Sequence, residues 1–474
     1  MNWNELLCEK RRRTSSTSAI ADESRNEFQR DYHRIIGSAS FRRLQDKTQV
    51  FPLDRGDFVR TRLTHSLEVA SFAKSLGQMI FRTVMENGID KDITADRIVK
   101  ICSILECSGL IHDIGNPPFG HFGEDLIRDW FRKKLPDMTF GGRKVTNILT
   151  REMAADLCNF EGNAQAFRLL TKLHFIVDGN GMNLTYPLLN TIIKYPVPST
   201  GIDRESGDIR QKKMGYYQAD KDIFEDVTSS TGAYSHRHPL AFILEAADDI
   251  AYKTADIEDA VKKGFITYKV LVDELRSNYA EKCRTDAEKE TIIQTVERLE
   301  GYCAQALENA VSSPEQNAVQ RCMIYVQGIL LDCAQTSFTA NYSEIMNGTF
   351  KKELLAVSRG CILADALSDM ADRFVFRSKT IYKLEIAAEA IYSFLLEKLT
   401  RAAVLYDTDL PRSNIDMRIM ELVSDNYIRA YSTCSEGCDE AERLYLRLLL
   451  VTDFICGMTD GYAKKLYREL NGID

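Results

Sequence analysis

Helical spacing of apolar residues is the strongest constraint on how this chain can fold. Over most of its 474 residues the apolar side chains recur at positions i, i+3 and i+4, few segments alternate between apolar and polar residues, and there are only 10 prolines. This period places apolar side chains on one face of an α-helix. We therefore predict an all-α fold in which many helices bury their apolar faces against one another.

Residues 48–62 are the exception to this pattern. They contain two short extended runs, T-Q-V-F-P-L and F-V-R-T-R, on either side of a turn sequence that includes Gly56, and this arrangement is typical of a β-hairpin. Elsewhere the apolar spacing predicts helices at 64–81, 98–113, 119–135, 188–193 and 239–262, with loops at 136–150 and 196–215. The expected fold is therefore multi-helical with one small β-hairpin near residues 48–62.

Domain boundaries are weakly marked in the sequence. Residues 1–30 are polar and rich in arginine, which predicts a loosely ordered N-terminal arm. Residues 31–265 contain nearly every motif that suggests chemistry, and residues 266–474 consist mainly of long helical periods. We therefore expect an arm, a core that carries the functional site, and a helical C-terminal region, with the weakest joint near residues 265–285.

Charge and cysteine content restrict the class of protein. The formal net charge is −8, which argues against nucleic acid as the main partner but permits a local basic groove. The 12 cysteines have no framework spacing, so we expect free thiols, and the pair Cys434 and Cys438 lacks two further ligands for zinc. The N-terminal sequence has no apolar signal segment, and no apolar run is long enough to span a bilayer. We expect a soluble, cytoplasmic protein with no membrane partner.

The most informative motif is the sequence L-I-H-D-I-G-N-P-P-F-G-H-F-G-E at residues 110–124. It places His112 and Asp113 side by side at the end of an apolar helical run. A buried pair of this kind needs polar partners or a metal ion to offset the loss of solvation. The motif therefore suggests a metal site at the end of this helix.

Two further residues complete the candidate metal site. His65 lies on the same predicted helix face as the apolar Val69, so it should face the core, and Asp248 is flanked by small apolar residues in L-E-A-A-D-D-I-A-Y. Two imidazoles and two carboxylates suit Mn, Fe, Ni, Co, Zn or Mg and leave open positions for water and phosphate oxygens. Each histidine alone would more often be an ordinary core residue, so the hypothesis depends on the combination.

A second pair of chemically active residues follows in the same motif. His121 and Glu124 are spaced i, i+3 at the start of a predicted helix, so they can share one face. A carboxylate that orients an imidazole fixes its tautomer and raises its basicity. The alternative for Glu124 is a helix-start carboxylate that is stabilised by the helix dipole. The remaining histidines, which lack ligand spacing to the site and are expected to be structural, are His33, His174, His236 and His238.

Five ordered sequence strings resemble one enzyme family. They are F-R-R-L-Q-D-K-T-Q-V-F-P at 41–52, R-T-R-L-T-H-S at 60–66, H-D-I-G-N-P-P-F-G-H-F-G-E at 112–124, F-E-G-N-A-Q at 160–165 and E-A-A-D-D-I-A-Y at 245–252. The order H…HD…D resembles the signature of the HD phosphohydrolase superfamily, and the strings resemble those of bacterial deoxyguanosinetriphosphate triphosphohydrolases (dGTPases). The resemblance is dense over residues 30–265 and returns in C-G-M-T-D-G-Y-A at 456–463.

The resemblance implies a reaction and a set of metal ligands. Water and dGTP, or another dNTP, would give a deoxynucleoside and intact tripolyphosphate. The implied ligands of one divalent metal per subunit are His65, His112, Asp113 and Asp248, with Mg or Mn as the first choice and Ni, Co, Fe or Zn as alternatives. His121 and Glu124 would act in catalysis at the scissile P–O5′ bond, with His121 in proton transfer; the alternative is that metal-bound water is the attacking group and His121 only positions it. Residues 31–265 would form the HD phosphohydrolase core, and residues 266–474 would complete the substrate pocket and the oligomer contacts.

The resemblance also implies substrate contacts. The expected phosphate contacts are Arg62, Asn163, Lys194, Tyr195 and Lys213. The expected sugar contacts are Gln49, Tyr252 and Asp256, and the expected base contacts are Phe376 and Glu385. From composition alone, the lysines could be solvated surface residues, Tyr252 a core aromatic and Asp256 a solvated helix acid. Asp248, Tyr252 and Asp256 nevertheless follow i, i+4, i+8 spacing and should form one stripe on a helix.

Partners and rival functions follow from the same resemblance. It implies a homo-oligomer, a hexamer in the family, and single-stranded DNA as an additional partner. One alternative is an HD phosphohydrolase that acts on another nucleotide, and another is a nucleic-acid-binding regulatory protein with a vestigial HD site. Several cations near the motifs argue against a monophosphatase, and the complete set of ligands with His121 and Glu124 argues against a vestigial site. One departure from close family members is Asn159, where histidine is common.

Overall fold

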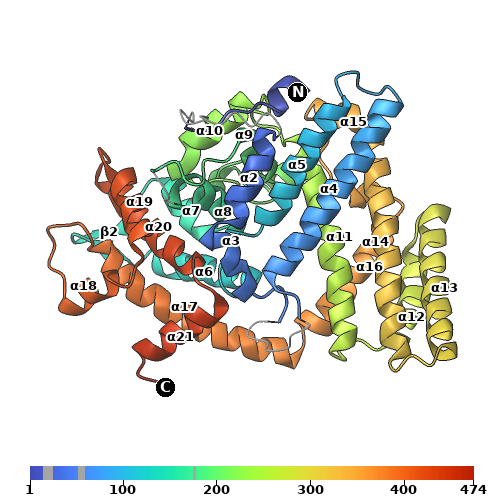
Figure 1. Cartoon of the computed structure of the whole chain (residues 1–474). Coiled ribbons are helices and arrows are strands. Elements are labelled where there is room, and N and C mark those ends of the chain that lie inside the picture. Colours follow the sequence, from blue (N-terminus) through green and yellow to red (C-terminus); the bar gives the residue numbers. More distant parts are fainter. Residues whose placement is uncertain (14–24, 52–58, 175–177, 474) are drawn as a thin grey trace. The chain divides into compact units, whose positions relative to one another are not determined.

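The computed structural model describes residues 1–13, 25–51, 59–174 and 178–473. Its described residues are mostly helical (Figure 1), so the predicted all-α class is confirmed. The described part contains one sheet, made of β1 (Thr139–Phe140) and β2 (Arg143–Lys144), which pair antiparallel. Gly141 and Gly142 join them with φ angles of 56° and 76°, which is the left-handed backbone that a two-residue hairpin turn requires.

The sheet lies in the predicted loop at 136–150 and not near residues 48–62. There the pairing among described residues is one antiparallel bridge between Thr48 and Thr61, reinforced by a hydrogen bond from the Arg62 N–H to the Lys47 carbonyl at 2.9 Å. The ends of the predicted hairpin therefore meet. Residues 52–58, which would form its turn, lie outside the described residues.

The contacts divide the chain into two compact units. The first comprises Met1–Ser66, Leu110–Ala241 and Glu385–Asp474, and the second comprises Leu67–Gly109 and Phe242–Leu384. The helices that lie within the first unit are α1 (Trp3–Leu6), α2 (Glu27–Ile36), α3 (Ala39–Arg43), α6 (Gly120–Lys134), α7 (Arg151–Cys158), α8 (Gly162–Arg168), α9 (Tyr186–Thr191), α10 (Lys221–Ser230), α18 (Asn414–Met420), α19 (Asp425–Ser435), α20 (Glu440–Cys456) and α21 (Asp460–Leu470). Those within the second are α12 (Tyr268–Asp273), α13 (Asp286–Glu308), α14 (Pro314–Ala340), α15 (Tyr342–Met346) and α16 (Cys361–Ala371).

Four long helices have residues in both units: α4 (Arg62–Glu86), α5 (Ala95–Ile111), α11 (Pro239–Lys262) and α17 (Lys379–Val404). Both ends of α11 agree with the sequence prediction, since proline is well suited to the first turn of a helix. The helix α5 ends at Ile111, two residues earlier than predicted. His112 and Asp113 therefore lie in the turn that follows the helix, where the Ile114 N–H bonds to the Ile111 carbonyl at 3.1 Å.

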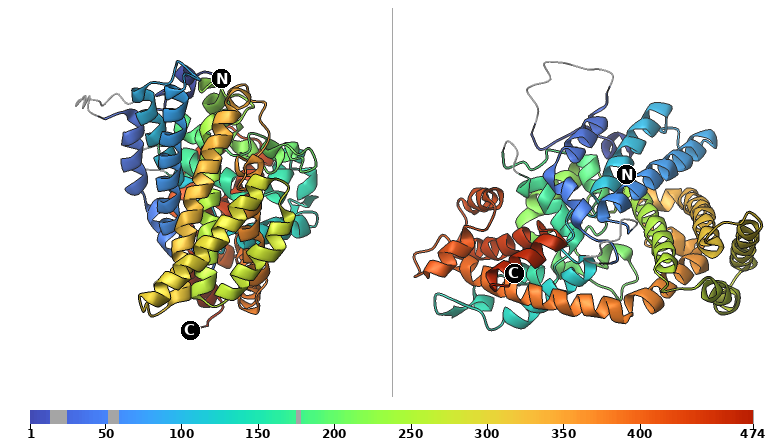
Figure 2. Two further views of the ribbon diagram at one scale, coloured as in Figure 1. Left: turned by 90° about the vertical axis from the view of Figure 1, so that its right-hand side faces the viewer. Right: turned by 60° about the horizontal axis from the view of Figure 1, so that its bottom comes forward.

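The core of the first unit is built around α20, which lies beside α19 (Figure 1). Every residue of α20 from Leu444 to Cys456 is buried. In the second unit α13 and α14 lie side by side (Figures 1 and 2), and Thr285 and Glu288 form a capping box that starts α13. No helix in the described part of the chain is long and apolar enough to cross a membrane.

The N-terminal segment is ordered more firmly than its composition predicts. Trp3 and Leu6 are fully buried, and the Leu6 carbonyl lies 3.2 Å from Nε2 of His238. Arg11 pairs with the buried Asp31 at 2.5 Å. The prediction of a loosely ordered arm is therefore wrong for residues 1–13, because two apolar side chains and one arginine find buried partners that are distant in sequence. Residues 14–24 lie outside the described residues.

Candidate metal and catalytic site

Two histidines and an aspartate form a cluster with the chemistry of a metal site. His65 lies in the first turn of α4, and His112 and Asp113 follow the last residue of α5. One ligand atom from each residue lies within 4.8 Å of the other two, and the two imidazole rings meet edge to face with centroids 5.3 Å apart. Both histidines are buried and Asp113 is half-buried. The structure thus brings together three of the four predicted ligands.

Asp113 is oriented by two polar side chains. The Arg62 guanidinium donates to Oδ2, and Nδ2 of Asn116 donates to Oδ1 at 2.7 Å. Arg62 is buried, and a Cβ at Gly120 would come within 2.4 Å of its Nη2 atom. Arg62, a predicted phosphate contact, therefore also fixes the direction of the Asp113 carboxylate. Partners of this kind orient metal ligands.

The His121–Glu124 pair forms as the i, i+3 spacing predicted. Nδ1 of His121 lies 3.0 Å from Oε2 of Glu124, and the other Glu124 oxygen, Oε1, accepts the Gly162 N–H at 2.8 Å. The His121 side chain is 76% exposed, whereas that of Glu124 is 1% exposed. The hydrogen bond and negative charge of Glu124 raise the pKa of His121. Burial opposes ionisation of Glu124, but the hydrogen bond and charge of His121, together with the charges of Lys213 and Arg128, outweigh it and lower the pKa of Glu124.

Close packing of glycines sets the backbone around this pair. A Cβ at Gly162 would lie 2.1 Å from Oδ1 of Asn116 and 2.6 Å from Oε1 of Glu124, and one at Gly115 would lie 2.1 Å from the backbone nitrogen of Ala166. The start of α8 is thus packed directly against both halves of the 110–124 motif. This contact explains why glycine stands at positions 115 and 162, since a larger side chain at either would not fit.

The backbone that leads into His121 is strained. Phe119 has a φ of 62° and Gly120 a φ of 60°. Glycine adopts such angles readily, but a non-glycine residue in this region costs roughly 1–3 kcal/mol, and such residues are frequent at active sites. Phe119 is buried, so the surrounding structure must hold it in this conformation.

A buried carboxylate that the sequence prediction missed connects the predicted phosphate contacts. Glu161 accepts a hydrogen bond from Nδ2 of Asn163 at 2.7 Å and forms an ion pair with Nζ of Lys213 at 2.9 Å. Burial, followed by the negative charge of Glu124, raises the pKa of Glu161. The sequence signal that could have identified Glu161 is its position in the string F-E-G-N-A-Q, two residues before the predicted phosphate contact Asn163. The structure thus joins Asn163 and Lys213 through Glu161.

The other predicted phosphate contacts lie on neighbouring loops of the first unit. Tyr195 is buried, and Lys194 is half-buried. A Cβ at Gly215 would come within 1.9 Å of the Tyr195 carbonyl oxygen. The segment that carries Lys213 therefore passes directly against the segment that carries Lys194 and Tyr195.

The remaining predicted site residues are divided between the two units. Gln49 and Glu385 belong to the first, and both are half-buried; burial, with the charge of Asp125, raises the pKa of Glu385. Those in the second unit are Asp248, Tyr252, Asp256 and Phe376. The first three follow i, i+4, i+8 spacing along α11, and Asp256 is 2% exposed. Asp256 is therefore not a solvated helix acid.

Comparisons with known proteins place the chain in a family. The HD domain family matches residues 62–185. The chain is 44% identical over 482 residues to a deoxyguanosinetriphosphate triphosphohydrolase-like protein of Listeria monocytogenes, with all of both chains covered. It is 32% identical over 486 residues to a deoxyguanosinetriphosphate triphosphohydrolase of Yersinia enterocolitica, with 94% of this chain and 93% of that protein covered. The chain therefore belongs to the deoxyguanosinetriphosphate triphosphohydrolase family of HD-domain enzymes.

Proposed function

We propose that this enzyme is a divalent-metal-dependent triphosphohydrolase of deoxynucleoside triphosphates, with dGTP as its preferred substrate. Water would attack the α-phosphorus, and the products would be deoxyguanosine and tripolyphosphate. The observation that carries the proposal is the cluster of His65, His112 and Asp113 in the same unit as the His121–Glu124 pair. The name of the Yersinia relative supports the choice of dGTP.

The clustered donors suit a divalent cation. Imidazole nitrogens and a carboxylate oxygen bind Mn, Fe, Co, Ni, Zn and, less readily, Mg, and the three donors here are close enough to share one ion. We propose one ion per subunit, Mg²⁺ or Mn²⁺, with Asp248 as the fourth ligand. Such an ion would polarise the α-phosphate and offset its developing negative charge.

The protein's own contribution to bond cleavage is a proton. The 5′-oxygen that leaves the α-phosphorus must be protonated, and the hydrogen bond and charge of Glu124, which raise the pKa of His121, favour the imidazolium that would donate the proton. Because Glu124 is hydrogen-bonded to Nδ1, the proton would be donated from Nε2 of the exposed ring. Glu124 would hold the ring in the required orientation.

The proposed substrate contacts supply charge and shape. Lys213, Asn163, Lys194 and Tyr195, together with Arg62, would bind the triphosphate. We further propose that Gln49, Tyr252 and Asp256 contact the sugar and that Phe376 and Glu385 contact the base. The buried Asp256 and the stripe that it forms with Tyr252 support a polar contact at that end of α11.

A product analysis tests the proposal. The enzyme is incubated with each of the four dNTPs and with GTP, in the presence of Mg²⁺ or Mn²⁺, and the products are separated by ion-pair chromatography. We expect deoxyguanosine and tripolyphosphate from dGTP, and no turnover after chelation of the metal. Release of orthophosphate instead would exclude the proposed bond cleavage.

Variants of two histidines supply the matched control. His112→Ala should abolish turnover because it removes a metal ligand, whereas the exposed His33→Ala should keep the activity of the wild type. Full activity in the His112→Ala variant would contradict the metal proposal.

A further inference from the structure

We infer that Asp460 is a positioning residue for catalysis. It holds the left-handed backbone at Phe119 and thereby sets the orientation of His121, which follows two residues later at the start of α6. This inference rests on the proposed function, because it assigns His121 a role in the reaction. The relevant loop, residues 116–120, joins the turn that carries His112 and Asp113 to the helix that carries His121.

The Asp460 carboxylate bridges two segments that are far from it in sequence. Oδ1 accepts the backbone N–H of Phe119 at 2.9 Å, and Oδ2 accepts both the backbone N–H of Thr48, at 3.1 Å, and its hydroxyl. Asp460 is the first residue of α21, and an acid at this position is often explained by its favourable interaction with the helix dipole alone. Here the carboxylate is 2% exposed and is bonded to residues outside its own helix.

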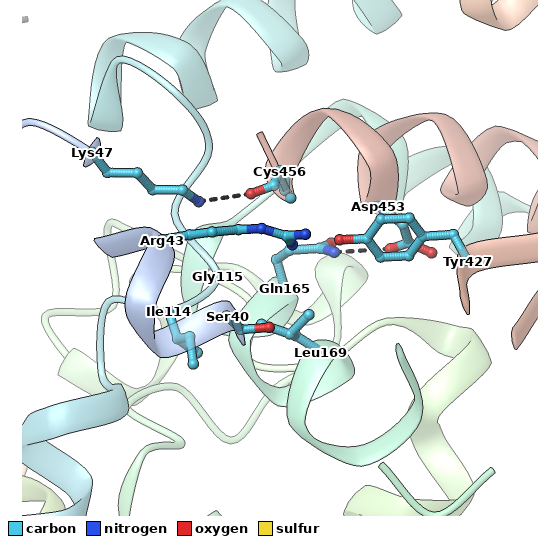
Figure 3. Close-up of a pocket in the computed structure, with 11 residues that line it drawn as sticks. Ser40, Arg43, Lys47, Ile114, Gly115, Gln165, Leu169, Tyr427, Asp453 and Cys456 are labelled. Carbon is cyan, nitrogen blue, oxygen red and sulfur yellow. Dashed lines mark hydrogen bonds between the residues drawn. The ribbon is translucent and has the colours of Figure 1, made fainter. Parts of the chain in front are cut away.

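Two further buried side chains hold the same loop by its carbonyl groups. Nζ of Lys47 donates to the carbonyl of Asn116 at 2.6 Å, and the Tyr392 hydroxyl donates to the carbonyl of Pro118 at 2.7 Å. Figure 3 shows the second bond of Lys47, to the carbonyl of Cys456 at 2.7 Å. Lys47 and Tyr392 are almost fully buried. The loop backbone is therefore fixed at residues 116, 118 and 119. Asp460 provides the contact at the residue with the unfavourable φ angle.

Loss of the Asp460 carboxylate should act on orientation and not on the metal ligands. Without an acceptor for its N–H, Phe119 can relax from the left-handed region, and the start of α6 then turns. His65 and His112 keep their ring contact, Asp113 keeps its bond from Arg62, and the His121–Glu124 pair remains intact because both residues lie on α6. The reacting groups would be displaced relative to one another, and such displacements lower the rate more than the binding of substrate.

The test compares Asp460→Ala with Asp416→Ala. Asp416 is also a buried aspartate in the first turn of a helix of the same unit, but it contacts Ser413 and Arg401 and not the loop. We expect Asp460→Ala to lower kcat on the order of 10- to 100-fold with little change in KM, in the bound metal per chain or in the position of the pH profile. Asp416→Ala should retain the wild-type kcat.

Hydrogen exchange followed by mass spectrometry gives a readout that does not depend on turnover. Peptides that cover residues 114–121 should exchange faster in Asp460→Ala than in the wild type, with or without Mn²⁺, and should be unchanged in Asp416→Ala. Asp460→Asn keeps one acceptor oxygen for the Phe119 N–H and should recover part of kcat. Equal kcat values and equal exchange in the Asp460→Ala and Asp416→Ala variants would overturn the inference.

The design separates this inference from the proposed function. If the wild type hydrolyses bis(p-nitrophenyl) phosphate with Mn²⁺ but does not release tripolyphosphate from dGTP, the proposed function fails, and the role of Asp460 is judged from hydrolysis of the phosphodiester. If the wild type releases tripolyphosphate and Asp460→Ala does so at the same rate, only the positioning role fails.

Discussion

The imidazole of His121 is exposed, but the carboxylate that orients it is buried. This arrangement lets one ring face a substrate while a charge inside the protein controls its protonation. The folded-state pKa of His121 is raised and that of Glu124 is lowered. The pair therefore stabilises the fold most at a pH between the ordinary pKa values of the two side chains, about 4.5 for Glu124 and about 6.5 for His121. The contribution declines as the pH rises through the raised pKa of His121 and as it falls through the lowered pKa of Glu124.

We predict that Glu124→Gln shifts the pH dependence of kcat to lower pH. If the His121 imidazolium donates the proton, activity is lost as the pH rises through the pKa of His121, and removal of the Glu124 charge lowers that pKa. The measurement is a pH–kcat profile of the wild type, of Glu124→Gln and of Asp125→Asn, an exposed neighbour. An alkaline limb at the same pH in all three proteins would refute the proposed role of His121.

At Gly162 the absence of a Cβ atom allows the close packing of Asn116 and Glu124. We predict that Gly162→Ala destabilises the protein by roughly 1–3 kcal/mol and lowers kcat, since the new Cβ would displace Asn116 and Glu124. Gly461 lies in helix α21 with open space around the Cβ position. Gly461→Ala should therefore be neutral or slightly stabilising in urea denaturation. A Gly162→Ala variant with wild-type stability and kcat would show that the loop can move aside.

Among the elements, the N-terminal segment shows how a few contacts order a polar stretch. Arg11 and Thr185 form an antiparallel bridge, and Thr185 donates to Asp31 from both its N–H and its hydroxyl. His238 is held by the Leu6 carbonyl, and burial lowers the pKa of His238 to about 4, so its imidazole is neutral. The expectation that His238 is structural agrees with these contacts.

We predict that Arg11→Met destabilises the protein by about 3–5 kcal/mol, because it removes the nearer cationic partner of the buried Asp31 carboxylate and leaves only Arg34, at 3.9 Å. Burial already raises the pKa of Asp31, so the variant should lose further stability as the pH rises and the carboxyl ionises. Urea denaturation at pH 5 and pH 8 measures both effects. The double variant Arg11→Met/Asp31→Asn should regain part of the loss; no recovery would show that the charge of Asp31 is not the cause.

At the scale of the whole molecule, metal binding is coupled to folding. The proposed fourth ligand is Asp248, which lies on α11 outside the cluster of His65, His112 and Asp113. A metal that binds only the folded protein raises its stability by about 2.7 kcal/mol at roughly 100 times its Kd. The fourth ligand can therefore be tested by the change in thermal stability on metal addition.

We predict that Mn²⁺ raises the Tm of the wild type and of Asp249→Asn, and raises that of Asp248→Asn much less. Asp249 is the matched control because it is adjacent and pairs with Lys253 at 3.0 Å. Differential scanning calorimetry with and without Mn²⁺ measures the shift. An equal rise in Asp248→Asn would remove Asp248 from the ligand set.

Local sequence patterns predicted the features that depend on neighbouring residues. The long helix α11, the His112–Asp113 pair at the end of an apolar helix and the His121–Glu124 contact each follow from spacings of a few residues. The small sheet was missed because it depends on two glycines within a loop that shows no alternating pattern. Glu161 was missed because its role depends on Glu124 and Lys213, which are far from it in the chain.

The sequence alone predicts the helical class and the residue types of the candidate site, because apolar periodicity and adjacent side chains are local features that extend over one or two helical turns. The contact between Leu6 and His238, the bond from Lys47 to Cys456 and the bond from Phe119 to Asp460 each join residues separated by hundreds of positions. No local pattern records such contacts, because they form when distant segments are packed into the same core. The motif supplies the candidate reactive groups, and the packed fold sets the direction in which they point.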